Sequence, residues 1–296
     1  MTLQVFMYKV KNRLFRTFYT LFNLHPTSAP YISPDGFWRL AQHRLDTGRN
    51  MDGARVSPGD VVFVRTDELE RFRKEVLPII HARFVLITHD SDVNIDESKV
   101  GIADDPRIIH WFAKNLLVRH PKVTAIPIGL ENRRLHNNGI VAHFDRLRAN
   151  SHERKIRILY AFAVGTNKKS RGAALEVLRS MPLADGPEWV HSKLYREALV
   201  EYAFVVSPQG NGFDCHRTWE ALYVGTIPIV ERSPFFDSFP DLPVLAVDDW
   251  KVMSSWDEAF LKKTYEELSA RLPSCPYLWL DYWVRQIAEQ RAKALV

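Results

Sequence analysis

Residues 207–230 read SPQGNGFDCHRTWEALYVGTIPIV and combine turn-forming, charged and apolar residues between two strand-like stretches. The apolar AFVV before them has strand character, but PQGNG cannot continue a strand, because proline lacks an amide donor and glycine permits positive φ. FDCHRTWEALYV then carries apolar side chains at helical spacing and ends before Gly225, a typical C-cap. TIPIV predicts another strand. The glycine-rich loop therefore brings a helix N-terminus to the carboxyl end of a strand, where open α/β sheets bind ligands.

The first turns of this predicted helix carry polar side chains suited to a nucleotide. Free backbone amides and the helix dipole favour an anion, and Arg217 adds a full positive charge. Glu220 lies three residues after Arg217 and one turn beyond His216, so all three can share a face. A carboxylate there can accept hydrogen bonds from both hydroxyls of a ribose. The alternative is a plain i,i+3 ion pair, and the loop matches neither the Walker pattern nor G-x-G-x-x-G.

The composition is that of a soluble globular protein. The 296 residues are 46% hydrophobic and 25% charged, and this length fits one large domain or two ordinary ones. A net charge of +5 and a pI near 9.1 favour anionic partners, and phosphate-bearing small molecules satisfy that preference as well as nucleic acid does. No basic stripe, zinc pattern or RNP-like sequence is found, so nucleic-acid binding is disfavoured.

Cysteine content and the N-terminal residues bear on localisation. Two cysteines, Cys215 and Cys275, make neither a disulfide scaffold nor a zinc site, which favours a reducing, cytoplasmic location. The segment MTLQVFMYKVKNRLFRTFYTLFNL is interrupted by basic residues and resembles neither a signal peptide nor a membrane span. The interrupting residues are Lys9, Lys11, Arg13 and Arg16. We expect an ordinary strand and helix there, with an amphipathic surface helix as the alternative.

Apolar runs alternate with amphipathic segments along the chain, which predicts an α/β fold with parallel sheets. In the first half, strands are expected within 60–66, 83–92 and 123–134, with a helix over 67–80. Residues 136–155 are polar and basic, and the pattern then restarts. In the second half we expect a helix over 172–181, a helical C-terminal segment, and strands within 156–164, 202–208, 226–231 and 243–247. The predicted domains are 1–145 and 146–296.

Residues 207–230 resemble the nucleotide-sugar-binding signature of exostosin-like glycosyltransferases. The resemblance involves the proline after a strand, the glycine-rich loop, HRTWEAL, and then Gly225 and IPIV. Two further segments are similar to sequences of that family, HPKVTAIPIGLENR (120–133) and VDDW (247–250). The resemblance covers about a third of the chain. The resemblance implies the glycosyltransferase-B fold, two Rossmann-like domains facing a cleft with a C-terminal helical return segment. It also implies transfer of a sugar from a nucleotide-sugar donor.

The resemblance assigns most donor contacts to the second half. Glu220 would hold the ribose, while Arg217 and the loop amides of Gly210, Asn211 and Gly212 would hold the diphosphate. The turn GTNKKSR supplies further candidates for the diphosphate, of which Arg171 is preferred, or else a solvated basic loop. The other residues of that turn are Asn167, Lys168 and Lys169. The remaining residues placed near the donor are Ser207, Asp214 and His216, the last with a capping role as the alternative.

Transfer with inversion needs one general base for the acceptor hydroxyl, and THDSD after the strand RFVLI supplies carboxylates and a histidine. We rank Asp90 first, with Asp92 and His89 beside it, and Glu131 as the runner-up, flanked by Arg133. Ordinary turn chemistry is the alternative for this loop. DSD also has the Asp-x-Asp form of a metal-dependent transferase of the other common fold, so a metal site is the alternative. No metal or cofactor is expected, because the strand–helix alternation restarts after a linker and the donor signature lies in the second half. Cations and a helix N-terminus can neutralise a leaving diphosphate without a metal.

The resemblance therefore implies a metal-independent, inverting glycosyltransferase that acts on a glycan hydroxyl with a UDP-sugar, UDP-xylose being one candidate. The alternatives are a GDP-sugar (fucosyl-type) transferase and a non-catalytic sugar- or nucleotide-binding module of the same fold. No nucleic-acid partner and no membrane span are expected.

Overall fold

The computed structural model describes residues 12–19, 21–22, 24–150, 153–186 and 192–293. The chain divides into two compact units. Unit 1 comprises Met1–Val141 and Trp279–Val296, and unit 2 comprises Ala142–Leu278. The C-terminal residues thus belong to unit 1, whereas the sequence-based division placed all of 146–296 in the second domain. The expected N-terminal strand lies outside the described residues, and residues 12–19 form a helix.

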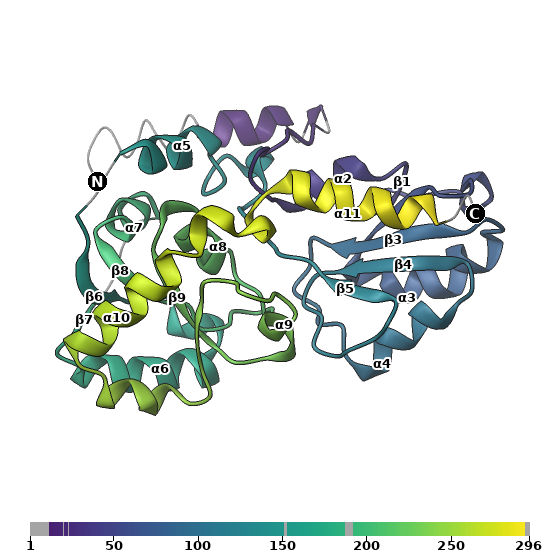
Figure 1. The fold of residues 1–296 in the computed structure, drawn as a ribbon. Helices are drawn as coiled ribbons and strands as arrows, with labels where there is room; N and C mark the ends of the chain where they lie inside the picture. The colour runs from purple at the N-terminus through teal and green to yellow at the C-terminus, as the bar shows by residue number, and fades with distance from the viewer. Residues whose placement is uncertain (1–11, 20, 23, 151–152, 187–191, 294–296) are drawn as a thin grey trace. The chain divides into compact units, whose positions relative to one another are not determined.

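Unit 1 is built on a five-stranded parallel sheet whose strands follow one another in chain order (Figure 1). Its strands are β1 (His43–Leu45), β2 (Val61–Arg65), β3 (Phe84–His89), β4 (Ile108–Ala113) and β5 (Val123–Ala125). β2 and β3 are mainly apolar and, apart from Arg65 at the end of β2, buried, as is typical of parallel strands covered on both faces. Because all five strands are parallel, the loops that follow them emerge at one edge.

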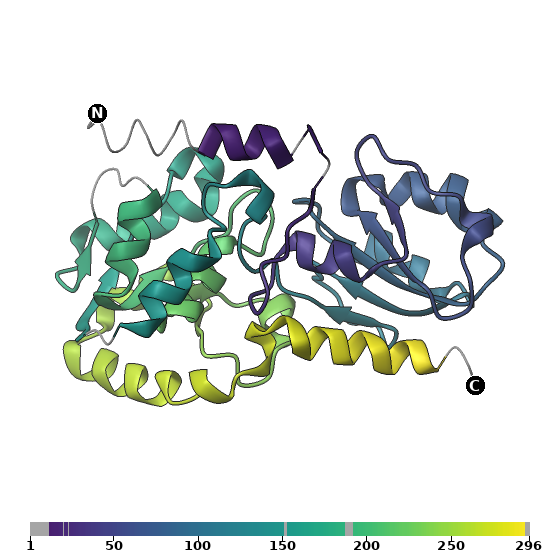
Figure 2. The ribbon, with the colours of Figure 1, turned by 90° about the horizontal axis from the view of Figure 1, so that it is seen from above.

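Helices cover both faces of this sheet (Figure 2). On one face, Phe37 of α2 (Pro34–Leu40) packs against Trp283 of α11 (Leu280–Ala292), with ring centroids 6.3 Å apart. On the other, Phe72 contacts Phe84 of β3 at 6.2 Å. Phe72 lies in the predicted helix 67–80, which is a composite. It consists of η2 (Thr66–Glu68), α3 (Leu69–Arg71), the π-helical η3 (Phe72–Val76) and η4 (Leu77–Ile79). The short helix α4 (Glu97–Val100) precedes β4.

Unit 2 contains a second five-stranded parallel sheet, in the order β10-β9-β8-β6-β7. The strands are β6 (Lys155–Leu159), β7 (Ala184–Asp185), β8 (Tyr202–Val206), β9 (Ile227–Glu231) and β10 (Leu245–Val247). The chain passes from β6 to β7 on one side and then returns to add β8 on the other. The strand order therefore reverses between β6 and β8, and such a switch point is where doubly wound sheets bind ligands.

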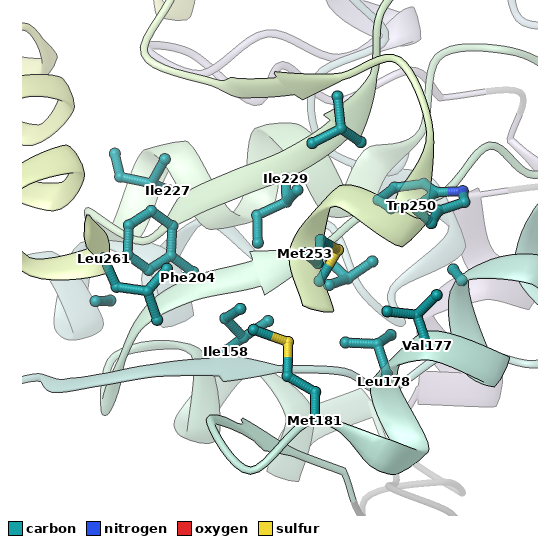
Figure 3. Packing of buried hydrophobic residues seen from close by; sticks show 14 of the residues in the cluster. Ile158, Val177, Leu178, Met181, Phe204, Ile227, Ile229, Trp250, Met253 and Leu261 are labelled. Carbon is teal, nitrogen blue, oxygen red and sulfur yellow. The ribbon is translucent and has the colours of Figure 1, made fainter. Parts of the chain in front are cut away.

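The core of unit 2 lies between this sheet and its helices (Figure 3). Strand residues Ile158, Phe204 and Ile229 meet Leu178 of α6 (Lys168–Ser180) and Leu261 of α10 (Glu258–Ser269). Fully burying a side chain of this size contributes about 1.5–3 kcal/mol. The other helices are α5 (Val141–Ala149), α7 (Ser192–Leu199), α8 (His216–Val224) and α9 (Pro234–Asp237), and the short helical turns include η7 (Val164–Thr166) and η8 (Trp250–Ser255).

The sequence-based expectation of an α/β chain with two parallel sheets is confirmed. Gly225 ends α8 with φ of 87°, the left-handed C-cap that its glycine predicts. The expected helix 172–181 begins earlier, at Lys168, because the side chain of Asn167 caps it by accepting a hydrogen bond from the Ser170 amide at 3.1 Å. In the described part of the chain, no helix has the length and apolarity needed to cross a bilayer.

Candidate active site

The switch point of unit 2 brings together two segments that are about forty residues apart in the sequence. One follows β6 and leads into α6, and the other follows β8 and leads into α8. Hydrogen bonds join them directly. Arg171 donates from Nε to the carbonyl oxygen of Gln209 at 3.1 Å, and Asn167 donates from Nδ2 to that of Gly210 at 3.0 Å. Two helix N-termini are thereby held at the same carboxyl edge of the sheet.

Arg217, in the first turn of α8, reaches back to the segment after β6. Its Nη2 donates to the carbonyl oxygen of Ala161 at 3.2 Å, and its Cζ lies 5.7 Å from the ring centroid of Tyr195 on α7. Nε of Arg217 is buried and forms no hydrogen bond of good geometry among the described residues, although the guanidinium interacts with the Tyr195 hydroxyl and opposes the rise in the pKa of Tyr195. A buried donor without a partner needs an explanation, and a bound acceptor is one.

The loop after β8 approaches these cations closely at Gly210. A Cβ at this position would lie 3.1 Å from Nη2 of Arg171 and 3.4 Å from Sγ of Cys215. The amide of Gly210 donates to the carbonyl oxygen of Gly212 at 3.1 Å, which folds the loop on itself. The glycine therefore lets the loop backbone lie against the guanidinium, as the sequence PQGNG predicts for a tight loop.

The electrostatics of this edge favour an anion. Burial and the nearby charge of Arg217 lower the pKa of Arg171, whose side chain is only 6% exposed. Within the described ranges, no carboxylate forms an ion pair with Arg171 or Arg217. The first amides of α6 and α8 add partial positive charge. A buried and a half-buried arginine beside two helix N-termini form a site that a diphosphate can neutralise.

Glu220 lies on the second turn of α8 and is 6% exposed. Burial raises the pKa of Tyr195 on α7, the charge of Arg217 opposes that rise, and the charge of Glu220 adds to it. Tyr195 is itself buried, between α7 and α8. The carboxylate thus sits on the helix that carries Arg217, one turn further from the N-terminus.

Several residues predicted to contact the donor make bonds within the fold. Asp214 is buried and accepts a hydrogen bond from Nε1 of Trp219 at 2.8 Å, and the Ser207 and Thr218 hydroxyls are 2.9 Å apart. His216 is half-buried at the first position of α8. Gly212 is buried, while the exposed residues of the predicted site are Asn211, Lys168 and Lys169.

Unit 1 presents a separate polar cluster at the carboxyl edge of its own sheet. Asp90 directly follows β3 and has φ of 55°, a left-handed conformation that Asp tolerates better than most residues. Its Oδ1 accepts a hydrogen bond from Nδ2 of Asn132 at 3.0 Å, and its Oδ2 lies 3.2 Å from Nη2 of Arg134. Both partners follow β5, so the carboxylate after β3 is held by residues of another loop at the same edge of the parallel sheet.

A second carboxylate, Asp35 of α2, shares the same guanidinium. Nε of Arg134 donates to Oδ1 of Asp35 at 3.0 Å, and Nδ1 of His25 lies 2.7 Å from the same oxygen. The backbone amide of Asp35 donates to Oδ1 of Asn132 at 2.6 Å. Arg134 therefore contacts both carboxylates, while Asn132 contacts the Asp90 carboxylate and the Asp35 backbone, and Asp90 is held on two sides.

Asp90 has the electrostatic character of a general base. Burial raises the pKa of its carboxyl group, the Arg134 guanidinium opposes that rise, and the charge of Asp35 adds to it. The side chain keeps 31% of its surface exposed, whereas that of Asp35 is 2% exposed. A carboxylate with a raised pKa and some access to solvent accepts a proton more readily than an ordinary one.

The other residues predicted as bases have different surroundings. His89 is fully buried; its Nδ1 accepts from the Asp90 amide at 2.8 Å, so its Nε2 donates to the Pro127 carbonyl oxygen at 3.1 Å. The side chain of Asp92 is 59% exposed, with its carboxylate 3.8 Å from Nζ of Lys114.

The candidates after β5 lie in a different loop. The Glu131 carboxylate accepts a hydrogen bond from the Asn138 amide at 2.7 Å. Arg133 is exposed and donates to the Thr27 carbonyl oxygen at 3.3 Å.

The sequence pointed to the loop of Asp90 but not to the residues that hold it. Asn132 and Arg134 stand beside the predicted Glu131 and Arg133, so the polar run ENRR was a usable signal. Asp35 had only a helix-start signal, SPDG, which does not indicate a contact with Arg134. No sequence signal pointed to Tyr195 as a residue of the site, because an aromatic residue on a helix is usually a core residue.

No protein-family model and no curated protein matches the chain. Among solved structures it is similar to the α,α-trehalose 6-phosphate synthase from Burkholderia multivorans, with TM-score 0.44, 10% identity, and coverage of 82% of this chain and 72% of that one. It is similar to AviGT4, a glycosyltransferase involved in avilamycin A biosynthesis, with TM-score 0.37, 12% identity, and coverage of 78% and 85%.

A third similar structure is the pneumococcal O-GlcNAc transferase GtfA in complex with UDP and GlcNAc, with TM-score 0.32, 14% identity and coverage of 81% of this chain. The chain spans 56% of that protein and 58% of the matched chain in a GtfA/B complex. Each likeness is weak, and the architecture of this chain follows from its own two parallel sheets.

Proposed function

We propose that this protein is a nucleotide-sugar-dependent glycosyltransferase of the glycosyltransferase-B type. In this proposal unit 2 binds the nucleoside diphosphate of the donor at its switch point, and Asp90 of unit 1 deprotonates a glycan hydroxyl. The observation that carries it is the pair of cations beside the N-termini of α6 and α8, the buried Arg171 and the half-buried Arg217. That site fits the two negative phosphates of a nucleoside diphosphate better than it fits a neutral ligand.

The leaving group is the diphosphate, and its charge grows as the bond to the anomeric carbon breaks. Arg171 and Arg217 are held by backbone carbonyl oxygens and are already oriented before the donor binds. Preorganised cations of this kind stabilise developing charge without a metal ion. Glu220 would bind the ribose hydroxyls in the same site.

Asp90 supports the catalytic half of the proposal. Its raised pKa and its fixation by Asn132 and Arg134 suit a base that takes one proton from the acceptor as the hydroxyl oxygen attacks. A single base is sufficient for transfer with inversion. The donor in this proposal is a UDP-sugar, with UDP-xylose as one candidate and a GDP-sugar as the alternative.

Calorimetric titration with UDP and with GDP, in the presence of a chelator, tests the donor site. We expect one nucleotide to bind without added metal, and loss of binding on chelation would contradict the metal-free mechanism. Incubation with a panel of nucleotide sugars and glycan acceptors then tests the reaction. Transfer or slow hydrolysis supports an enzyme, whereas binding without turnover would identify a non-catalytic binding module.

A further inference from the structure

Glu231 is a carboxylate at the carboxyl edge of the unit 2 sheet that the proposed donor contacts do not use. It is the last residue of β9, and its Oε2 accepts a hydrogen bond from Oγ of Ser170 at 2.6 Å. Ser170 is buried in the first turn of α6, directly before Arg171. The carboxylate is therefore attached to the helix start that carries one of the two proposed diphosphate contacts.

Consecutive residues of α6 join the ends of two neighbouring strands. Arg171 donates to the carbonyl oxygen of Gln209 in the loop after β8, and Ser170 donates to Glu231 at the end of β9. β8 and β9 are adjacent and parallel, so both ends lie at the same edge of the sheet. Glu231 thus lies beside the loop that approaches the proposed diphosphate site.

No cation of the described residues neutralises the charge of Glu231. The bond from Ser170 is the one hydrogen bond or ion pair that its carboxylate forms with the part of the chain that the structure describes. The neighbouring Arg232 is paired with Asp248 instead, at 2.8 Å. Glu231 is half-buried and retains access to solvent. Such a carboxylate accepts hydrogen bonds from neutral donors and repels a second anion.

The topology of unit 2 places Glu220 and Glu231 on different sides of the proposed diphosphate contacts. The step from β6 to β7 runs in one direction along the sheet, whereas the steps to β8 and β9 run in the other. Because crossovers between parallel strands are right-handed, α6 covers one face of the sheet, and α7 and α8 cover the other (Figure 1). Glu220 lies on α8, while Glu231 is attached to α6.

A nucleotide sugar is a linear molecule in which the diphosphate separates the ribose from the sugar. With the ribose at Glu220 and the diphosphate at the two arginines, the sugar lies toward Glu231. We propose that Glu231 lines the subsite for the donor sugar, where it accepts a hydrogen bond from a sugar hydroxyl and excludes donors whose sugar carries a carboxylate. This inference rests on the proposed function, from which it takes the positions of the ribose and the diphosphate.

The charge of Glu231 defines the class of donor. A uronate would bring a second carboxylate beside one that no cation of the described residues neutralises, and such a pair of like charges lowers affinity. A neutral sugar offers hydroxyl donors to the same carboxylate. The donor in this proposal is therefore a nucleotide linked to an uncharged sugar.

Calorimetric titration with UDP-glucose and UDP-glucuronate, in the presence of a chelator, tests the exclusion. These two donors differ only at C6, which is a hydroxymethyl group in one and a carboxylate in the other. We expect the unmodified protein to bind UDP-glucuronate about tenfold or more weakly than UDP-glucose. If GDP is the nucleotide that binds, GDP-mannose and GDP-mannuronate form the equivalent pair.

Glu231→Gln removes the charge and keeps the shape, and its amide oxygen can still accept the hydrogen bond from Ser170. We expect this variant to bind the two sugar donors with nearly equal affinity and to bind UDP alone as the unmodified protein does. Glu176→Gln is the matched control, because Glu176 is exposed on α6 and the substitution changes the net charge equally. This control should keep the discrimination.

Equal binding of UDP-glucose and UDP-glucuronate by the unmodified protein would overturn the inference, even if Glu231→Gln fails to fold. Discrimination that persists in Glu231→Gln, or that is lost equally in Glu176→Gln, would also overturn it. In each of these cases the nucleotide still binds, and the proposed function stands. If the unmodified protein binds neither UDP nor GDP, the proposed function itself is contradicted, and the role of Glu231 with it.

Discussion

Arg134 and Asp90 lie 3.2 Å apart, between Nη2 and Oδ2, although 44 residues separate them in the sequence. The guanidinium is shared with Asp35, at 3.0 Å from its Nε. One cation therefore neutralises two carboxylates of different exposure, and the more exposed one, Asp90, is the one that a substrate can reach.

Asp90→Asn should lower turnover on the order of a hundredfold or more without changing donor affinity, because the amide keeps the shape but accepts no proton. Initial rates and calorimetry measure the two effects. Asp92→Asn is the matched control, since its carboxylate is 59% exposed and should matter little. Near-normal transfer by the Asp90→Asn protein would assign the base elsewhere.

The same substitution should not destabilise the fold at neutral pH. The folded-state pKa of Asp90 is raised, so the folded protein holds that proton more tightly than the unfolded chain. The stability gained from protonation is present at low pH and is lost as pH rises through the folded pKa. Asp90→Asn should therefore melt at the same or a higher temperature at pH 7, with the difference shrinking toward acid pH. A large loss of stability at pH 7 would indicate a structural role.

Arg134→Gln should shift the rise of activity with pH to higher pH. The guanidinium opposes the raised pKa of Asp90, so its removal lets that pKa rise further, and the base is active only above it. Arg133→Gln is the adjacent control, because Arg133 is exposed and donates a hydrogen bond to the Thr27 backbone carbonyl oxygen. If the pH–rate profile of Arg134→Gln is the same as that of the unmodified protein, Arg134 does not affect the pKa of the base.

Arg217→Gln should weaken UDP about tenfold or more, since a charge-assisted contact with the diphosphate is lost. Calorimetry in chelator measures the change. Arg232→Gln serves as the control, because Arg232 is exposed and paired with Asp248 at 2.8 Å. Equal loss in both variants would point to general electrostatic attraction instead of a defined site.

Gly210→Ala tests the close approach of the loop to Arg171. The added Cβ would lie 3.1 Å from Nη2, so the loop or the guanidinium must move, and UDP affinity should fall several-fold. Gly165→Ala is the control: it makes the same substitution in the segment between β6 and α6, where nothing lies within 4 Å of the added Cβ. It should bind UDP normally. If both variants bind UDP alike, the packing of the loop on Arg171 does not position the nucleotide.

Glu220→Gln should weaken UDP by about 1–3 kcal/mol if the carboxylate holds the ribose hydroxyls. The sharper comparison uses 2′-deoxy-UDP. The unmodified protein should discriminate against it, and the variant should discriminate much less. Because Glu220 is 6% exposed, its folding is measured in parallel by thermal unfolding. A variant that melts early but binds both nucleotides normally would show that Glu220 is structural.

Much of the local structure could be predicted from short-range rules. The loop PQGNG, the C-cap at Gly225 and the apolar strands β2, β3 and β9 each follow from residues within a few positions of one another. Predictions failed where a single side chain or a packing contact decided the boundary. Asn167 starts α6 at Lys168, and the segment 67–80 contains a π-helical stretch that no local pattern indicated.

The sequence by itself determined the α/β alternation, the cationic helix start at Arg217 and the position of Asp90 at a strand end, because these depend on periodicity and on neighbouring residues. Only the tertiary structure decided which carboxylates are shared by Arg134, that Arg171 meets the loop after β8, and that Leu21 and Phe22 stay exposed. Those facts depend on parallel strands that bring distant loops to one edge, and on which surfaces the rest of the chain covers. A pattern of residue types does not contain that information, since many pairings of loops are compatible with the same alternation.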